Sequence, residues 1–222
     1  VRFCEAIRTL RTGLVLSDID RPRQIVLVTS TLANEGKSTV AVNLAFSMSH
    51  IERVLLIEAD LRNPTLASHF TLPPKAPGLA DLIAGHSRLE DCVHTVGKLA
   101  MLPAGTVPSN PQELISSPRL ARILGALKSR YQRIIIDSPP SQVVSDALLL
   151  AKLSNALIYV IHAESTPIPM VQKGLGQLMR NKAPVIGVVL NQYDLTKAGR
   201  YGSPYESYGY LSSSSFSPAS GS

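Results

Sequence analysis

The sequence predicts an α/β fold in which a parallel sheet is covered by helices on both faces. Short, almost continuous apolar segments alternate along the 222 residues with segments of helical periodicity, as expected for parallel strands that are buried on both faces. A loop of small and polar residues (30–39) joins one apolar segment to a helical one, which is the strand–loop–helix order of such folds. The length suits one domain with its own core.

Each expected element is an apolar run or an amphipathic segment bounded by turn residues. Strands are expected at 24–28, 54–57, 133–136, 156–161 and 185–190. Helices are expected at 2–16, from the end of the loop to about residue 50, and at 79–84, 118–130, 146–153 and 170–180. Proline interrupts both kinds of element, so the connection with Pro103, Pro108 and Pro111 is expected on the surface. The folded domain is expected to span 1–196.

The loop at 30–39 has the features of a phosphate-binding loop. Lys37 supplies a cation for the terminal phosphates, Ser38 offers a hydroxyl to magnesium, and the following helix adds its positive end. The pattern G-x-x-x-x-G-K-[ST] is kept except that Thr31 replaces the first glycine, and Asn34 tolerates the left-handed backbone that the turn needs. Nucleotide contacts are expected from Ala33, Asn34, Glu35, Gly36, Lys37, Ser38 and Thr39. The alternative is a chance Gly-Lys-Ser at a helix start.

Asp137 follows the apolar residues of the strand expected at 133–136. Open α/β sheets bind their ligands beyond the carboxyl ends of the strands, so this carboxylate is a candidate to position magnesium together with Ser38. Magnesium keeps much of its hydration, and such an aspartate usually holds it through water. The alternative is that Asp137 only caps the next turn.

A second apolar strand ends in Glu58, Asp60 and Arg62, at alternating positions. If strand geometry persists, alternation places the three side chains on one side. Two carboxylates near a terminal phosphate can orient an attacking hydroxyl and hold magnesium, while the arginine neutralises them or meets phosphate. A structural cluster of ion pairs is the alternative.

These three segments resemble, in order and spacing, the Walker A, Walker A-prime and Walker B motifs of the bacterial tyrosine kinases, the cytoplasmic kinase domains associated with polysaccharide copolymerases. The middle motif of that family is three apolar residues followed by D-x-D-x-R; Asp60 and Arg62 match it, and Glu58 replaces the first aspartate. The resemblance implies a P-loop NTPase-like fold and transfer of the ATP γ-phosphoryl group to tyrosine, with ATP and Mg²⁺ as cofactors. It implies catalytic roles for Lys37, Glu58, Asp60, Arg62 and Asp137, and metal positions at Ser38, Asp60 and Asp137.

The resemblance also implies a setting for the chain. The family acts in the polymerisation and export of exopolysaccharide or capsule, at the cytoplasmic face of the bacterial inner membrane. A membrane-embedded activator and sugar-nucleotide enzymes as further substrates are therefore expected partners. Because the chain opens at Val1 inside a helical pattern, we expect a soluble fragment whose membrane portion or partner region has been cut away.

Glu5, Arg8 and Arg11 in the first expected helix reproduce an E-x-x-R-x-x-R pattern. Spacings of three residues share a broad face of a helix, so these charges could meet acids on another protomer. In the family that the chain resembles, this pattern links subunits into a ring, which predicts a ring-like homo-oligomer. An ordinary solvated helix face is the alternative.

The expected flexible tail, 197–222, is rich in glycine and serine. It contains Tyr201, Tyr205, Tyr208 and Tyr210, four of the seven tyrosines of the chain. A segment so poor in aliphatic side chains does not fold alone, so these phenols are expected to be mobile and accessible. The resemblance implies that they are the phosphoacceptors of a neighbouring subunit. A low-complexity tail without such a role is the alternative.

Asn191 begins an N-x-x-D segment after the last expected strand and is a candidate contact for adenine, although a simple turn explains it equally well.

The competing class of protein is a partner-regulated ATPase switch of the DNA-partitioning or division-site type. Such proteins carry a signature lysine where this chain has Leu32, and they lack a terminal tyrosine cluster. Both features favour the kinase.

The composition limits the partners further. The formal charge is +6, but lysine and arginine are scattered and no segment interleaves them with aromatics, so an anionic membrane face is favoured and no nucleic acid is expected. The sequence contains no apolar run near bilayer length and no signal peptide. Cys4 and Cys92 lie in apolar patterns without metal-ligand spacing, so buried structural thiols in a reducing cytosol are expected.

Overall fold

The computed structural model describes residues 2–17, 22–73, 75–143 and 145–194. The helices and strands lie in a compact unit that ends at Gln192, and a separate unit begins at Tyr193. The tail and its tyrosines, Tyr201, Tyr205, Tyr208 and Tyr210, lie outside the described residues. No helix among the described residues is long and apolar enough to span a bilayer.

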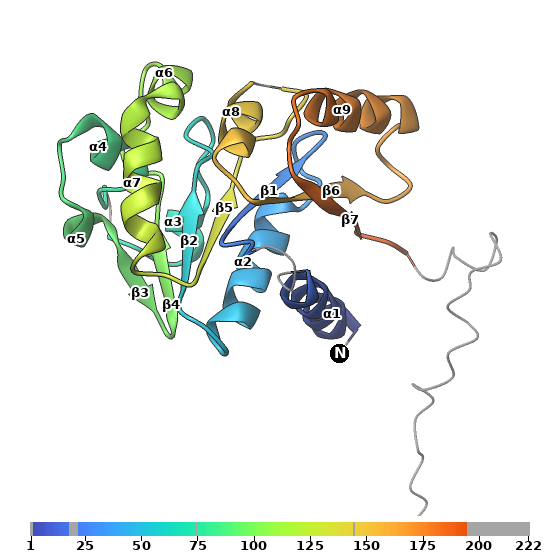
Figure 1. Cartoon of the computed structure of the whole chain (residues 1–222), viewed down its shortest axis with the longest axis horizontal. Coiled ribbons are helices and arrows are strands. Elements are labelled where there is room, and N and C mark those ends of the chain that lie inside the picture. The colour runs from blue at the N-terminus through green and yellow to red at the C-terminus, as the bar shows by residue number, and fades with distance from the viewer. Residues whose placement is uncertain (1, 18–21, 74, 144, 195–222) are drawn as a thin grey trace, which may run out of the picture. The chain divides into compact units, whose positions relative to one another are not determined.

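A seven-stranded sheet forms the centre of the compact unit (Figure 1). Its strands, in spatial order, are β3 (His94–Val96), β4 (Leu99–Leu102), β2 (Val54–Glu58), β5 (Arg133–Asp137), β1 (Ile25–Ser30), β6 (Ala156–His162) and β7 (Val185–Asn191). All neighbours pair in parallel except β3 and β4, which are antiparallel. The parallel order brings the carboxyl ends of β1, β2 and β5 to one edge of the sheet.

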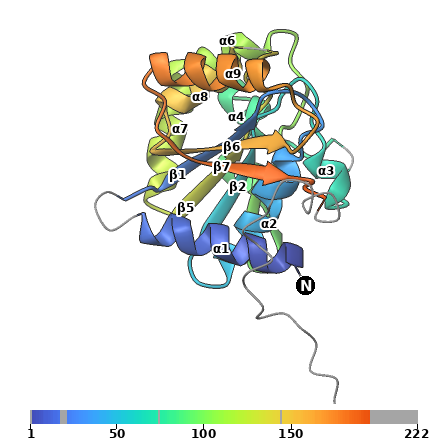
Figure 2. The same cartoon turned by 90° about the vertical axis from the view of Figure 1, so that its right-hand side faces the viewer.

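Helices cover both faces, as the sequence predicts (Figure 2). One face packs against α1 (Arg2–Leu16) and α2 (Lys37–Ser49), which contribute Leu14 and Leu44 to the core. On the other face lie α7 (Pro118–Lys128), α8 (Asp146–Lys152) and α9 (Ile168–Arg180). Shorter helices complete the fold: α3 (Leu66–His69), α4 (Leu79–Ala84), α5 (Leu89–Cys92) and α6 (Pro111–Ser116).

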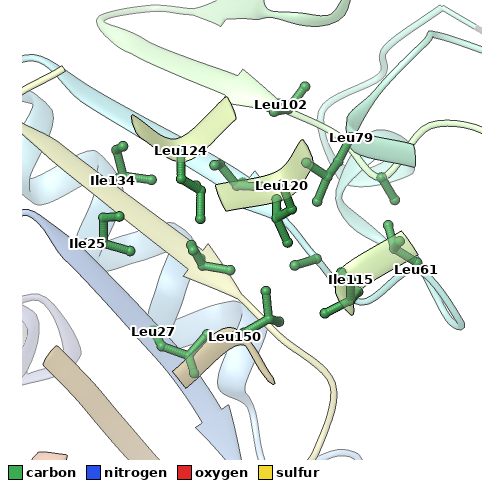
Figure 3. Close-up of a cluster of buried hydrophobic side chains, with 14 of the residues drawn as sticks. Ile25, Leu27, Leu61, Leu79, Leu102, Ile115, Leu120, Leu124, Ile134 and Leu150 are labelled. Atoms are coloured by element: carbon green, nitrogen blue, oxygen red, sulfur yellow. The ribbon is translucent and has the colours of Figure 1, made fainter. Parts of the chain in front are cut away.

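The alternation of side chains along each strand divides the core into two layers. Ile25 and Leu27 of β1 face the layer drawn in Figure 3, where Leu124 of α7 and Leu150 of α8 meet them. The intervening Val26 contributes to the layer under α2. Because both faces of the sheet are covered, its central strands read as continuous apolar runs.

The predicted elements are present with small shifts at their ends, and the parallel sheet with helices on both faces is confirmed. One antiparallel pair was not anticipated: β3 and β4 form a hairpin through Gly97, which adopts a φ of 61°. These strands have three and four residues, too few to give a clear periodic pattern.

The expectation that the proline-rich connection lies on the surface was wrong for two of its three prolines. Pro103 and Pro111 are buried. The Pro103 carbonyl accepts a hydrogen bond from Leu79 N at 2.7 Å, and Pro111 is the first residue of α6, where its missing N–H costs nothing. The expectation of buried thiols is confirmed for Cys92 and wrong for Cys4, which is exposed on α1.

Candidate active site

The loop between β1 and α2 has the backbone of a phosphate-binding turn. Asn34 and Gly36 adopt left-handed φ angles of 64° and 85°, so the role predicted for Asn34 in the turn is confirmed. The helix begins at Lys37, and Val40 N donates to the Gly36 carbonyl at 3.0 Å. A Cβ atom at Gly36 would collide with the Asn191 side chain, so only glycine fits both the angle and the space.

The buried side chain of Glu35 holds this loop in place. Its side chain is 2% exposed; Oε2 accepts a hydrogen bond from Leu32 N at 2.7 Å, and Oε1 accepts one from the Thr166 hydroxyl. The predicted nucleotide contact of Glu35 is therefore restricted to its backbone. Thr166, which follows β6, has no signal in the sequence because its partner is 131 residues away.

Lys37 joins the three predicted motifs. Its Nζ lies 3.2 Å from Asp60 Oδ2, 3.6 Å from Asp137 Oδ1 and 3.2 Å from Ser38 Oγ. The register of the sheet explains the meeting, because Asp137 at the end of β5 stands opposite Val28 of β1 on one side and Glu58 of β2 on the other. Two carboxylates and a hydroxyl thus surround one ammonium group.

Asp137 is the most deeply buried of these groups, with 1% of its surface exposed. Burial raises the pKa of its carboxyl to about 6, against the opposing effects of Lys37 and Ser38, and the charges of Glu58 and Asp60 raise it further. Its Oδ1 has no hydrogen-bond partner among the described residues, since the contact with Lys37 is an ion pair at 3.6 Å. An unsatisfied carboxylate oxygen beside the Ser38 hydroxyl fits Mg²⁺.

The described residues contain no group of three or more His, Cys, Asp or Glu side chains able to hold a metal alone. Such a set is not required for Mg²⁺, which takes phosphate oxygens and water as most of its ligands. Asp60, Asp137 and Ser38 each lie within 3.6 Å of Lys37 Nζ, and their role in holding a metal stays a prediction.

The structure gives Glu58 a different role from the predicted one. It is 1% exposed and does not line the cleft; Oε1 accepts hydrogen bonds from Thr65 N at 2.5 Å and Leu66 N at 2.7 Å, and Oε2 accepts one from Ala104 N at 3.1 Å. With both oxygens held by backbone N–H groups, Glu58 does not orient an acceptor hydroxyl. It holds the start of α3 and the segment after β4 in place.

The predicted alternation of Glu58, Asp60 and Arg62 on one side also fails, because β2 ends at Glu58. Beyond the strand, Asp60 turns toward Lys37 and accepts a hydrogen bond from Asn63 N at 3.2 Å. The Arg62 guanidinium pairs with Asp146, at 2.9 Å through Nε and 3.3 Å through Nη2. Asp146 gives no signal in the sequence beyond its place at a helix start.

A cleft of about 450 Å³ lies at this site. The phosphate-binding loop, Asp60 and Arg62 line it, together with residues that the sequence did not indicate: Asn63, Thr65, His69, Pro139, Pro140, Val143 and Gln192. Asn191 lies outside this lining. Its Nδ2 donates to the Glu35 carbonyl at 2.9 Å, so the structure gives it a hold on the loop, and the contact of its Oδ1 with adenine stays a prediction.

A phosphate-binding loop whose lysine meets two strand-end carboxylates defines the class of P-loop nucleotide-binding proteins. In agreement with this class, residues 24–192 match the family model of an AAA domain. The tyrosine-protein kinase YwqD of Bacillus subtilis is 33% identical over 89% of this chain and 84% of its own length. The chain belongs to the family of the bacterial tyrosine kinases.

Solved structures similar to this chain agree with its membership of this family. The kinase domain of VpsO is 38% identical, with a TM-score of 0.79 over 87% of this chain and all of that chain. The tyrosine-protein kinase Wzc of Salmonella typhimurium is 31% identical over 93% of this chain, which spans only 28% of Wzc and 28% of EpsB of Ralstonia solanacearum. The septum site-determining protein MinD of Pyrococcus horikoshii shares the fold, with a TM-score of 0.64 at 24% identity.

The raised pKa of Asp137 predicts how stability depends on pH in the nucleotide-free protein. The carboxyl has its ordinary pKa of 3.8 when unfolded and about 6 when folded, so the folded state binds the proton more tightly. This contribution to the free energy of unfolding is fully present below about pH 4 and is lost as the pH rises through 6. The slope reaches about 1.4 kcal/mol per pH unit.

Asp137→Asn is expected to remove this component from denaturant titrations between pH 4 and 7, because the amide does not ionise. Asp91→Asn is a matched control, since Asp91 is an exposed acid on α5. An Asp137→Asn protein with the same pH dependence as the wild type would contradict the assignment.

Proposed function

We propose that this chain is a protein-tyrosine kinase that transfers the γ-phosphoryl group of Mg-ATP to tyrosine, including the tail tyrosines of a neighbouring copy. The observation that carries the proposal is the position of Lys37 Nζ, which lies in the cleft with Asp60 and also contacts the buried Asp137. The similarity to tyrosine kinases at above 30% identity supports it, whereas the likeness to MinD, at 24%, concerns the fold alone.

The phosphates are held by the loop. Backbone N–H groups around Gly36 and the start of α2 face them, Thr39 meets the α-phosphate, and Lys37 stabilises the charge that develops on the β- and γ-phosphates. Ser38 and Asp137 are the residues that would hold Mg²⁺, and the bound ion would neutralise negative charge on the phosphates. In the free protein Lys37 occupies the two carboxylates, so nucleotide binding exchanges the partners of its ammonium group.

Asp60 is the group that orients the acceptor phenol. Its carboxylate lines the cleft, whereas Glu58 is committed to backbone N–H groups. Because the transition state of phosphoryl transfer is largely dissociative, a phenol with a free pKa of about 10 needs positioning more than prior deprotonation. Orientation of the phenol by the Asp60 carboxylate is therefore sufficient.

Assembly in a ring would supply the acceptor in trans. On α1, Arg8 pairs with Glu5 at 2.6 Å in an exposed contact, and Arg11 Nη1 donates to the Ser47 carbonyl of α2 at 3.2 Å. An exposed ion pair contributes little to folding, so Glu5 and Arg8 can exchange partners for another protomer. The same proposal includes a membrane-embedded activator, a location at the cytoplasmic face of the inner membrane and a role in exopolysaccharide export.

Lys37→Met is expected to lower tyrosine phosphorylation by roughly 100-fold or more, because it removes the cation that meets the phosphates. Lys128→Met, which changes an exposed lysine of α7, should leave the rate unchanged. The measurement is incorporation of labelled phosphate by the purified proteins. Phosphorylation by Lys37→Met at the wild-type rate would refute the assignment of the loop.

Arg8→Ala combined with Arg11→Ala is expected to lower the average mass in light scattering and to slow autophosphorylation, since a trans reaction depends on neighbour concentration. Arg122→Ala, on the exposed face of α7, is the control. An unchanged mass distribution would assign the α1 charges to an ordinary solvated face.

Replacement of Tyr201, Tyr205, Tyr208 and Tyr210 by phenylalanine is expected to remove most phosphate incorporation while ATP binding is retained. It should also keep the ring assembled in ATP, because each phosphotyrosine adds about 1.5 to 2 negative charges that disfavour docking in a carboxylate-lined cleft. Tyr193→Phe, outside the cluster, is the comparison. Phosphopeptide mapping decides the question: full incorporation at other sites would show that the tail is not the substrate.

A further inference from the structure

Arg62 and Asp146 form a two-point ion pair at the wall of the cleft. Nε and Nη2 of the guanidinium donate to the two oxygens of the carboxylate, at 2.9 and 3.3 Å. The two partners differ in environment: the Asp146 side chain is 2% exposed, whereas Arg62 is 39% exposed and lines the cleft. Two parallel hydrogen bonds fix the plane of a guanidinium as well as its place.

Asp146 depends on this arginine. In the part of the chain that the structure describes, Arg62 is the one basic side chain within ion-pair distance of it. A buried carboxylate without a counter-charge is strongly destabilising, so the pair is kept closed. Arg62, by contrast, is not fully used by the pair. Its third nitrogen, Nη1, has no hydrogen-bond partner among the described residues.

The position of the pair links the two loops that carry the reactive carboxylates. Arg62 follows Asp60 in the loop after β2, and Asp146 begins α8 after the loop that starts at Asp137. Asp60 is close enough that its charge favours the cationic form of Arg62. The pair therefore fixes a guanidinium next to the group that orients the acceptor.

We propose that Asp146 is a positioning residue for phosphoryl transfer, which holds Arg62 so that its free Nη1 stabilises the phosphoryl group in transit. The inference rests on the proposed kinase activity. In the step, the phenol oxygen bonds to the γ-phosphorus, the bond to the β–γ bridging oxygen breaks, and ADP leaves with the electron pair. The phenol proton passes to Asp60. Charge spread over the equatorial oxygens is where an arginine contributes most.

The test is a double-mutant cycle with Arg62→Ala, Asp146→Asn and the combined variant, using a peptide of residues 197–222 as the acceptor. Asp146→Asn is expected to lower kcat about 10-fold or more and to leave the KM for ATP within twofold. Because Asp146 acts through Arg62, adding Asp146→Asn to Arg62→Ala should cost no further activity. Asp91→Asn is the matched control, since it breaks the exposed pair with Arg88 at 3.3 Å.

Stability separates positioning from folding. Arg62→Ala leaves a buried charge, so its melting temperature should fall, and Asp146→Asn should restore it in the double variant without restoring kcat. Asp146→Glu keeps the charge and should recover part of the rate. In the free protein, the Nε–H resonance of Arg62 should exchange faster with water in Asp146→Asn.

Two results would overturn the proposal while the kinase assignment stands: an unchanged kcat in Asp146→Asn, or an equal loss caused by Asp146→Asn with and without Arg62. A wild-type protein that binds ATP but phosphorylates no tyrosine would instead refute the proposed function itself, and this inference with it.

Discussion

The contact of the Lys37 ammonium with Asp60 and Asp137 is the interaction on which the site depends. Two buried carboxylates at neighbouring strand ends repel each other, and the lysine between them offsets that repulsion in the free protein. The same ammonium is the group that terminal phosphates attract. Under the proposed function, the residue that offsets this repulsion is also the one that the nucleotide would engage, and a bound cation would then neutralise the two carboxylates.

This arrangement requires accurate placement of three strand ends, which the backbone of the sheet provides. Parallel pairing of β5 with both β1 and β2 sets Asp137 between the two neighbouring strands. Buried acids with backbone partners then fix the loops: Glu35 holds the phosphate-binding turn, and Glu58 holds the segments after β2 and β4. Lys37 and Asp60 line the cleft, whereas the buried Glu35 and Glu58 hold the backbone around it.

The fold and the chemical centre were predictable from the sequence because their signals are local. A loop between an apolar run and a helix, and an acid directly after a strand, place Lys37 and Asp137 without knowledge of the rest. Glu58 was assigned wrongly because its role depends on where β2 ends. The pairing of Arg62 with Asp146 spans 84 residues, and such a contact leaves no periodic trace in the sequence.

The hydrogen bonds from the end of the last strand have a consequence for the shape of the phosphate-binding loop. Asn191 and Gln192 donate to the carbonyls of Glu35 and Asn34, at 2.9 and 3.3 Å, across 156 and 158 residues of sequence. Gln192 is also the last residue of the compact unit, directly before the segment that leads to the tail tyrosines. The conformation of the phosphate-binding loop therefore depends on the two amide side chains at the end of β7 as well as on the residues of the loop itself.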